Sequence, residues 1–249
     1  MTALDGTWSF PPADLTLLSN DVHVWQIYLD QPASRLQQLA QTLSVDEQSK
    51  AERFYFEKDR KHFIVGRGFL RLILGRYLGI EPSQLQFCYG SRGKPDLAEI
   101  FSGSKLRFNL SHSHGLALYA FTCDRSVGVD IECIRPMPAA EQIVERFFSP
   151  REHSVFCSLP QNQKLEAFFN CWTRKEAYIK AIGDGLAHPL DRIEVSLTPG
   201  EPARLLSIEG NTHEASRWSL LELKPTSGYV AALVVEGSAW CLARWQWLE

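Results

Sequence analysis

The sequence predicts an α+β fold made of two similar halves, and three observations lead to this prediction. The chain has 249 residues, and its 45% apolar and 22% charged residues are typical of a protein with a sizeable core. Residues 59–78 and 163–182 each have the periodicity of a long helix. Short alternating stretches typical of antiparallel strands follow each of them. This repeated order favours a pseudo-repeat with a junction near Val127, and a single domain of unrelated elements is the alternative.

The N-terminal half is expected to cover residues 23–127, after an irregular lead-in over residues 1–22. Ser44 and Glu47 have the spacing of a capping box, which opens a helix. Gly79 stands where a left-handed residue would end the long helix. The patterns predict a strand over 23–29, helices over 44–54 and 59–78, and strands over 85–89, 106–110 and 116–121.

The C-terminal half is expected to cover residues 128–249 and to repeat the order of helices followed by strands. Ser149 and Pro150 are typical of a capped helix start, because serine accepts a backbone hydrogen bond and proline fits the first turn. The patterns predict helices near 143–147, from 149 and over 163–182, then strands over 193–197, 205–208, 218–223, 229–235 and 239–247. In each half we expect a long helix packed on a small antiparallel sheet.

Charge and composition exclude several classes of function. The 26 basic and 29 acidic residues give a net charge of −3, which does not favour general attraction to nucleic acid or anionic lipid. The longest apolar runs, such as 229–235, are much shorter than a membrane helix, and no basic residue precedes Arg35 as a signal peptide would require. The six cysteines form no C-x-x-C pair. We therefore expect a cytoplasmic protein with reduced thiols and without membrane or nucleic-acid partners.

Two acidic side chains share one face of a predicted strand at the start of the second half. Strand alternation places Asp130 and Glu132 on the same side, with Val129 and Ile131 on the other. Neighbouring carboxylates repel unless a positive charge lies between them. The pair is therefore either solvated at a sheet edge or a site for a hard cation such as Mg²⁺.

A second set of candidate residues lies along one face of the long helix predicted in the C-terminal half. Trp172, Glu176 and Lys180 are spaced four apart and lie along one face, so the last two can act at one place. The alternative is an exposed ion pair beside a core tryptophan. The spacing alone does not distinguish a site from an ordinary helix surface.

Two turns carry groups that suit a phosphate. Ser111 and His112 lie in a hydroxyl-rich turn that is either an anion site or a plain hairpin, and no G-x-S-x-G elbow supports a nucleophilic serine. Lys94 lies in a Gly/Pro turn, and the helix after residue 59 carries several basic residues, among them Lys61 and Arg67. Neither a P-loop nor a Rossmann frame surrounds them.

Five sequence blocks in this order resemble the 4′-phosphopantetheinyl transferases of the Sfp type. They are G-K-P at 93–95, F-N-L-S-H-S at 108–113, V-G-V-D-I-E at 127–132, R-F-F-S-P-R-E at 146–152 and W-T-R-K-E-A-Y-I-K at 172–180. The resemblance covers residues 23–236 and implies a pseudo-dimer with the active site between two similar α/β halves. It raises the metal interpretation of the acidic pair above the solvated-edge interpretation.

The resemblance implies a role for individual residues. Asp130, Glu132 and Glu176 would bind Mg²⁺, which also contacts the diphosphate of coenzyme A, and Lys180 would stabilise phosphate charge or the departing 3′,5′-ADP. Glu176 would act as the base, directly or through a metal-bound water. The positions implied to contact coenzyme A are Lys61, Arg67, Lys94, Pro95, Ser111, His112, Lys175 and Lys180.

The implied reaction is attack by a serine hydroxyl of an apo acyl or peptidyl carrier on the β-phosphorus of coenzyme A. The alternatives are a metal-dependent phosphohydrolase and a non-catalytic protein that binds coenzyme A or carriers. We expect a monomer, with Mg²⁺ as its cofactor, and an acidic carrier docking near Arg71 and Arg76. The sequence does not identify the carrier or its pathway.

Overall fold

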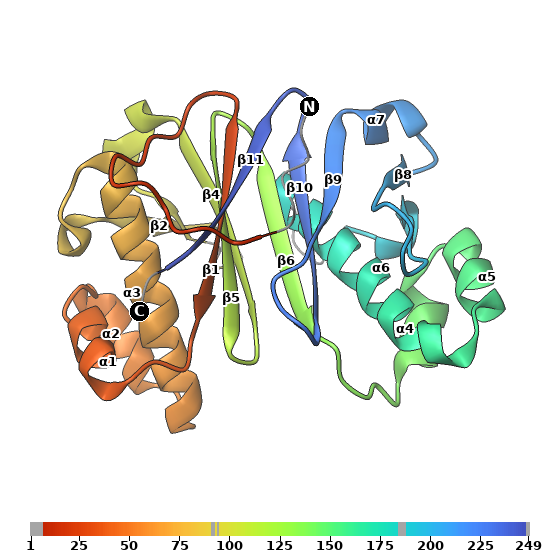
Figure 1. Cartoon of the computed structure of the whole chain (residues 1–249), viewed down its shortest axis with the longest axis horizontal. Helices are drawn as coiled ribbons and strands as arrows, with labels where there is room; N and C mark the ends of the chain where they lie inside the picture. Colours follow the sequence, from red (N-terminus) through yellow and green to blue (C-terminus); the bar gives the residue numbers. More distant parts are fainter. Residues whose placement is uncertain (1–6, 91–92, 94, 184–187, 248–249) are drawn as a thin grey trace.

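The computed structural model describes residues 7–90, 93, 95–183 and 188–247, and it confirms the predicted α+β fold. Two sheets lie face to face at the centre, and helices cover the outer side of each (Figure 1). The N-terminal half contains β1 (Asp21–Tyr28), α1 (Ala33–Ala40), α2 (Val45–Glu52), α3 (Glu57–Leu78), β2 (Phe87–Tyr89), β3 (Pro95–Leu97), β4 (Leu106–Ser113) and β5 (Leu116–Cys123).

The C-terminal half repeats this arrangement of a long helix on a sheet. It contains β6 (Val127–Cys133), α4 (Ala140–Phe147), α5 (Pro150–Ser158), α6 (Gln161–Ile182), β7 (Ile193–Val195), β8 (Leu205–Ile208), α7 (Thr212–Ser216), β9 (Trp218–Leu223), β10 (Tyr229–Glu236) and β11 (Cys241–Gln246). The long helices α3 and α6 both end at a glycine in the left-handed conformation, with φ of 67° at Gly79 and 82° at Gly183. None of the helices in the described ranges has the length and apolar character needed to cross a bilayer.

The last strand does not stay in the half that precedes it. β11 pairs with β1 and completes a four-stranded sheet in the order β11-β1-β5-β4, while the other sheet has the order β6-β10-β9. The β1–β11 pairing is parallel, whereas the sequence predicts antiparallel sheets. Ser9 of the lead-in pairs with Trp245 of β11, so the N-terminal segment lies along this edge. These contacts join residues more than 200 positions apart, which local patterns do not reveal.

Strand alternation distributes apolar side chains between three cores. In β1, Trp25 faces α3 and packs in a cluster with Phe69, while its neighbour Val24 faces the opposite sheet. Val129 of β6 meets that inner cluster, and the third cluster lies between α6 and the second sheet. The molecule therefore has four layers: helix, sheet, sheet and helix.

A glycine allows α6 to lie directly on β6. A Cβ atom on Gly128 would lie 2.0 Å from the carbonyl oxygen of Ala177 and 2.4 Å from the amide nitrogen of Ala181. Any side chain at this position would push the helix away from the strand. The glycine thus sets the distance between the two elements that carry the predicted site residues.

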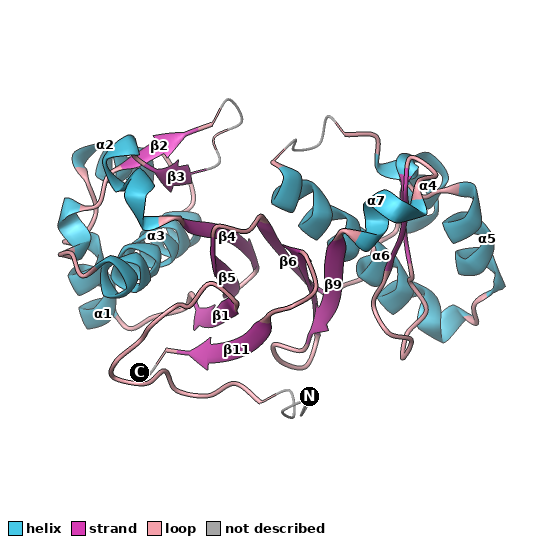
Figure 2. Cartoon of the chain, turned by 90° about the horizontal axis from the view of Figure 1, so that it is seen from above, coloured by secondary structure: helices cyan, strands magenta, loops and turns pink. Residues whose placement is uncertain are grey.

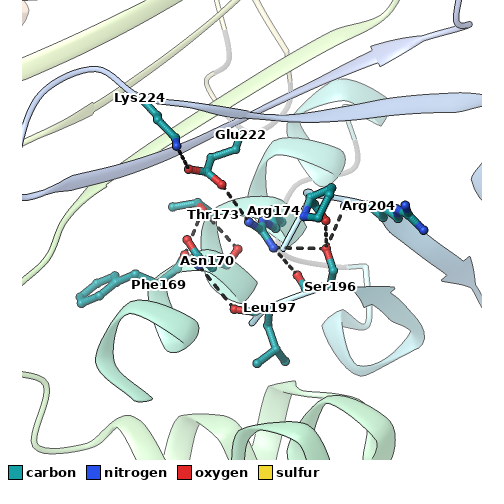
Figure 3. A network of polar contacts seen from close by, with 10 residues as sticks. Phe169, Asn170, Thr173, Arg174, Ser196, Leu197, Arg204, Glu222 and Lys224 are labelled. Carbon is teal, nitrogen blue, oxygen red and sulfur yellow. Dashed lines mark hydrogen bonds and ion pairs between the residues drawn. The ribbon is translucent and has the colours of Figure 1, made fainter. Parts of the chain in front are cut away.

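A buried arginine fixes α6 to the segment after β7. Arg174 donates to the carbonyl oxygen of Ser196 at 2.7 Å and to its hydroxyl at 3.2 Å, and it pairs with Glu222 of β9 at 3.5 Å (Figure 3). Asn170, one turn earlier, donates to the carbonyl of Leu197 at 3.4 Å. These contacts hold the helix in one orientation on its sheet.

Candidate functional site

The two halves meet where β4 lies beside β6 at the centre of the molecule (Figure 2). The Ser111 hydroxyl donates to Asp130 Oδ1 at 2.8 Å, and the Ser113 hydroxyl donates to Glu132 Oε2 at 2.9 Å. Alternate residues of one strand thus meet alternate residues of the other. The structure confirms that the two carboxylates share one face of β6.

Lys180 reaches this seam from the last turn of α6. Its Nζ donates to Asp130 Oδ1 at 2.6 Å and to Ser111 Oγ at 2.8 Å. Burial raises the pKa of Asp130, and Lys180 opposes this rise. Among the described residues, no group forms a hydrogen bond with the other carboxylate oxygen, Oδ2, although it is buried.

Glu176 lies one helical turn before Lys180 and completes an acidic cluster. Burial raises the pKa of Glu176 to about 7, the negative charges of Asp130 and Glu132 add to the rise, and Lys180 opposes it. The contact of Lys180 with Asp130 brings this face of α6 to the carboxylates of β6, as the resemblance implies. Trp172 instead packs against Phe168 in the core.

The cluster fits a divalent cation in its chemistry. It combines a buried Asp130 oxygen that has no hydrogen-bond partner in the described part of the chain with a raised pKa at Glu176, and a cation would relieve both. Within the described ranges, no three acidic, histidine or cysteine side chains form a ready-made metal site. Mg²⁺ in proteins commonly takes one or two carboxylates and completes its shell with water and substrate phosphates.

A cavity of about 440 Å³ opens beside the cluster. It lies between the two halves, and its wall comprises Gly93, Pro95, Phe108, Asn109, Leu110, Ser111, His112, Ile179, Lys180 and Gly183. Small-molecule sites in proteins typically have volumes of this order. The structure therefore brings Pro95, Ser111, His112 and Lys180 together, as predicted, whereas Lys94 lies outside the described residues.

His112 lines this cavity, and its surroundings favour the neutral form of its ring. Partial desolvation lowers the pKa of its ring, and the positive charge of Lys180 lowers it further. A neutral imidazole both donates and accepts a hydrogen bond. It can therefore bind a phosphate oxygen without adding a full positive charge.

The two basic residues expected at the 3′-phosphate do not line the cavity. Arg67 is buried and lies 3.3 Å from Glu47 Oε1, and its guanidinium lies over the ring of Phe87 at 5.1 Å. Its Nη1 forms no hydrogen bond within the described part of the chain. Lys61 is exposed and pairs with Glu57 at 2.8 Å.

The structure does not bring Lys175 to the cluster, which corrects the expectation that it contacts coenzyme A. Lys175 is only 1% exposed, pairs with the equally buried Glu152, and donates to the carbonyl oxygens of Phe147 and Leu190. Adjacent helix residues point about 100° apart. Lys175 therefore faces the core, while Glu176 faces the seam.

The expected docking role of Arg71 is also wrong. Arg71 is 1% exposed and donates to Glu47 Oε2 at 2.6 Å and to two backbone carbonyls beside the end of α3. Arg76 donates to the carbonyl of Pro12 at 2.8 Å and so holds the lead-in segment. Arg71 therefore stabilises the fold from the core, whereas Arg76 is half-buried and anchors the lead-in segment.

Two contacts to Glu132 are not among those predicted from the sequence. The Ser113 hydroxyl and Arg135 Nη1, at 3.1 Å, both donate to its Oε2. The signal for Ser113 was available, because strand alternation places it on the same face as Ser111. Arg135 follows the strand in an irregular segment, and no periodicity points to it.

Comparisons with known proteins agree with this arrangement. Residues 126–234 match the model of the 4′-phosphopantetheinyl transferase superfamily, and residues 30–123 match a model described as 4′-phosphopantetheinyl transferase, N-terminal. The chain is 52% identical to the 4′-phosphopantetheinyl transferase HetI of Nostoc sp. over 98% of its own length and 100% of that protein.

More distant relatives have the same description. The chain is 30% identical to the 4′-phosphopantetheinyl transferase Sfp of Bacillus subtilis, over 70% of this chain and 76% of that protein. It is 34% identical to the 4′-phosphopantetheinyl transferase psf-1 of Bacillus pumilus, over 69% and 71% of the two chains.

Proposed function

We propose that this chain, a member of the 4′-phosphopantetheinyl transferase family, binds Mg²⁺ at the seam between β6 and α6. Like the family, it transfers 4′-phosphopantetheine from coenzyme A to carrier proteins, and the cation would serve this transfer. The observation that supports this most is the acidic cluster beside the cavity between the two halves. A diphosphate in that cavity would lie next to the oxygens that need a cation.

Three carboxylates would hold the cation in this proposal. Asp130 offers Oδ2, Glu132 offers the oxygen that is not bound by Ser113 and Arg135, and Glu176 completes the set from the helix. When bound, Mg²⁺ would neutralise phosphate charge and polarise the phosphorus–oxygen bonds. The ion pair of Lys180 with Asp130 is consistent with a site prepared for a positive charge.

The protein residues would then orient the reactants and move one proton. The serine hydroxyl of the carrier would attack the β-phosphorus of coenzyme A, and its proton would pass to Glu176, directly or through a water molecule. The phosphorus–oxygen bond to the α-phosphate breaks, and 3′,5′-ADP leaves with the electron pair. Lys180 lines the cavity and would stabilise the charge on that leaving group.

The remaining contacts to coenzyme A are proposed from position and chemistry. Ser111 and His112 line the cavity and offer a hydroxyl and a neutral imidazole to the phosphates, while Pro95 lies at its wall. Arg67 has a guanidinium nitrogen without a hydrogen-bond partner among the described residues, which supports a role at the 3′-phosphate, and Lys61 would act from the surface. We further propose that the protein works as a monomer in the cytoplasm.

Intact-protein mass spectrometry tests this function. The protein is incubated with coenzyme A, Mg²⁺ and either an apo acyl carrier or an apo peptidyl carrier, and chromatography measures 3′,5′-ADP. We expect one phosphopantetheine on the carrier, an equal amount of 3′,5′-ADP, and loss of both with excess EDTA. A phosphohydrolase would instead release phosphate without a carrier, and a non-catalytic protein would bind coenzyme A without product.

A further inference from the structure

The Ser113 hydroxyl makes a directed hydrogen bond to one oxygen of Glu132. Ser113 is 7% exposed, and its Oγ accepts the backbone N–H of Cys133 at 3.1 Å. The hydroxyl proton is then available to Glu132 Oε2, 2.9 Å away, while the contact to His114 Nδ1 is longer, at 3.4 Å. The serine thus links the backbone of β6 to the carboxylate that the same strand carries.

The second donor to Glu132 acts on the same oxygen. Arg135 Nη1 donates to Oε2 at 3.1 Å and to the carbonyl of Cys133 at the same distance. Within the described residues, Glu132 Oε1 receives no hydrogen bond. One oxygen is therefore held by the protein, and the other remains for a ligand.

The two oxygens of Asp130, two residues earlier, differ in the same way. Its Oδ1 receives the Ser111 hydroxyl and Lys180 Nζ, and its Oδ2 has no partner among the residues described. In both cases a serine of β4 and a basic side chain hold one carboxylate oxygen. The same serine-to-carboxylate contact thus occurs twice between β4 and β6, at alternate residues of each strand, which indicates that the serines orient the two carboxylates.

We propose that Ser113 is a positioning residue that orients Glu132 toward the divalent cation. This inference rests on the proposed role of the metal. Groups that orient metal-binding carboxylates typically change metal affinity by about 10- to 100-fold when they are removed. Ser113 acts through Glu132 and has no contact of its own with the reacting atoms.

The chain offers a matched control for this hydrogen bond. Ser207 is 6% exposed, and its hydroxyl donates to Glu194 Oε2 at 2.9 Å. This pair lies on the β7–β8 hairpin and does not line the cavity. Ser207→Ala therefore removes an equivalent serine–glutamate bond away from the seam.

Binding of Mn²⁺ in the presence of coenzyme A, measured by electron paramagnetic resonance, tests the inference. We expect Ser113→Ala to raise the Kd for Mn²⁺ by about tenfold or more, Ser113→Thr to restore it to within about threefold, and Ser207→Ala to leave it unchanged. The Mg²⁺ concentration for half-maximal transfer should rise by the same factor in Ser113→Ala. The KM for the carrier should stay constant.

A Ser113→Ala protein with an unchanged Kd, or a Ser207→Ala protein with an equal shift, would overturn the positioning role. If the alanine variant does not fold by circular dichroism, Ser113→Cys, which keeps the volume with a weaker donor, should show the same rise. A wild-type protein that binds no Mn²⁺ but still transfers in EDTA would overturn the proposed metal role itself. These outcomes separate the two claims.

Discussion

Replacing Gly128 with alanine would separate β6 from α6 and thereby disturb both the fold and the site. The new Cβ atom would lie 2.0 Å from the Ala177 carbonyl oxygen and 2.4 Å from the Ala181 nitrogen, whereas ordinary contacts begin at 3.4 Å. The atoms in the way belong to the backbone, so no side-chain rotation relieves the overlap. The helix must retreat by about 1.4 Å, the difference between these distances.

This displacement sets the expected magnitudes. Overpacking in a core costs about 1–3 kcal/mol, and a backbone overlap belongs at the upper end or beyond. A loss of about 3 kcal/mol lowers Tm by roughly 6–12 °C in a chain of this size. Because Glu176 and Lys180 move with the helix, transfer should fall by about 100-fold, the cost of a displacement on the order of 1 Å at a reacting centre.

Thermal unfolding and transfer rates at a temperature where the variant is folded measure both effects. Gly103→Ala is the matched control, because its Cβ would have nothing within 4 Å, and it should behave as wild type in both assays. A Gly128→Ala protein that unfolds within about 2 °C of wild type and keeps its activity would contradict this expectation.

Three further predictions concern individual buried groups. Burial lowers the pKa of His23 to about 4. As the pH falls, the unfolded chain therefore binds a proton before the folded chain does, and the free energy of unfolding should fall by about 3 kcal/mol between pH 6.5 and 4. In urea unfolding, His23→Leu should lack this dependence of stability on pH. Lys175→Met leaves Glu152 buried without its partner and should cost about 3–5 kcal/mol in chemical unfolding, while the KM for coenzyme A of the folded protein stays constant. A raised KM would return Lys175 to the site. Asp130→Asn should abolish measurable transfer by mass spectrometry yet keep a native circular dichroism spectrum, and retained activity would remove Asp130 from the metal set.

Local rules predict the parts of the fold and site that depend on local geometry. Strand alternation places Asp130 and Glu132 together, and helical spacing places Glu176 one turn from Lys180. The capping box at Ser44 and the capped helix start at Ser149 both form as the sequence predicts. In each case a period of the backbone fixes which side chains share a face.

Other features depend on contacts that no local pattern contains. The parallel pairing of β11 with β1 joins segments near the two ends of the chain. Whether a basic residue such as Arg71 or Lys175 is buried depends on its neighbours in the fold. The sequence predicts an exposed Arg71, yet its contacts with Glu47 and backbone carbonyls hold it in the core. Lys175 could have been assigned to the core, because it lies about 100° around the helix from Glu176.

The central claim is that a divalent cation binds at the seam between the halves, on carboxylates from β6 and α6. Anomalous diffraction from crystals grown with coenzyme A and Mn²⁺ tests this claim most directly. We expect one strong anomalous peak at metal–oxygen bonding distance from Asp130, Glu132 and Glu176 and from the diphosphate. An ordered coenzyme A in the cavity, with the peak absent or bound by other residues, would contradict it.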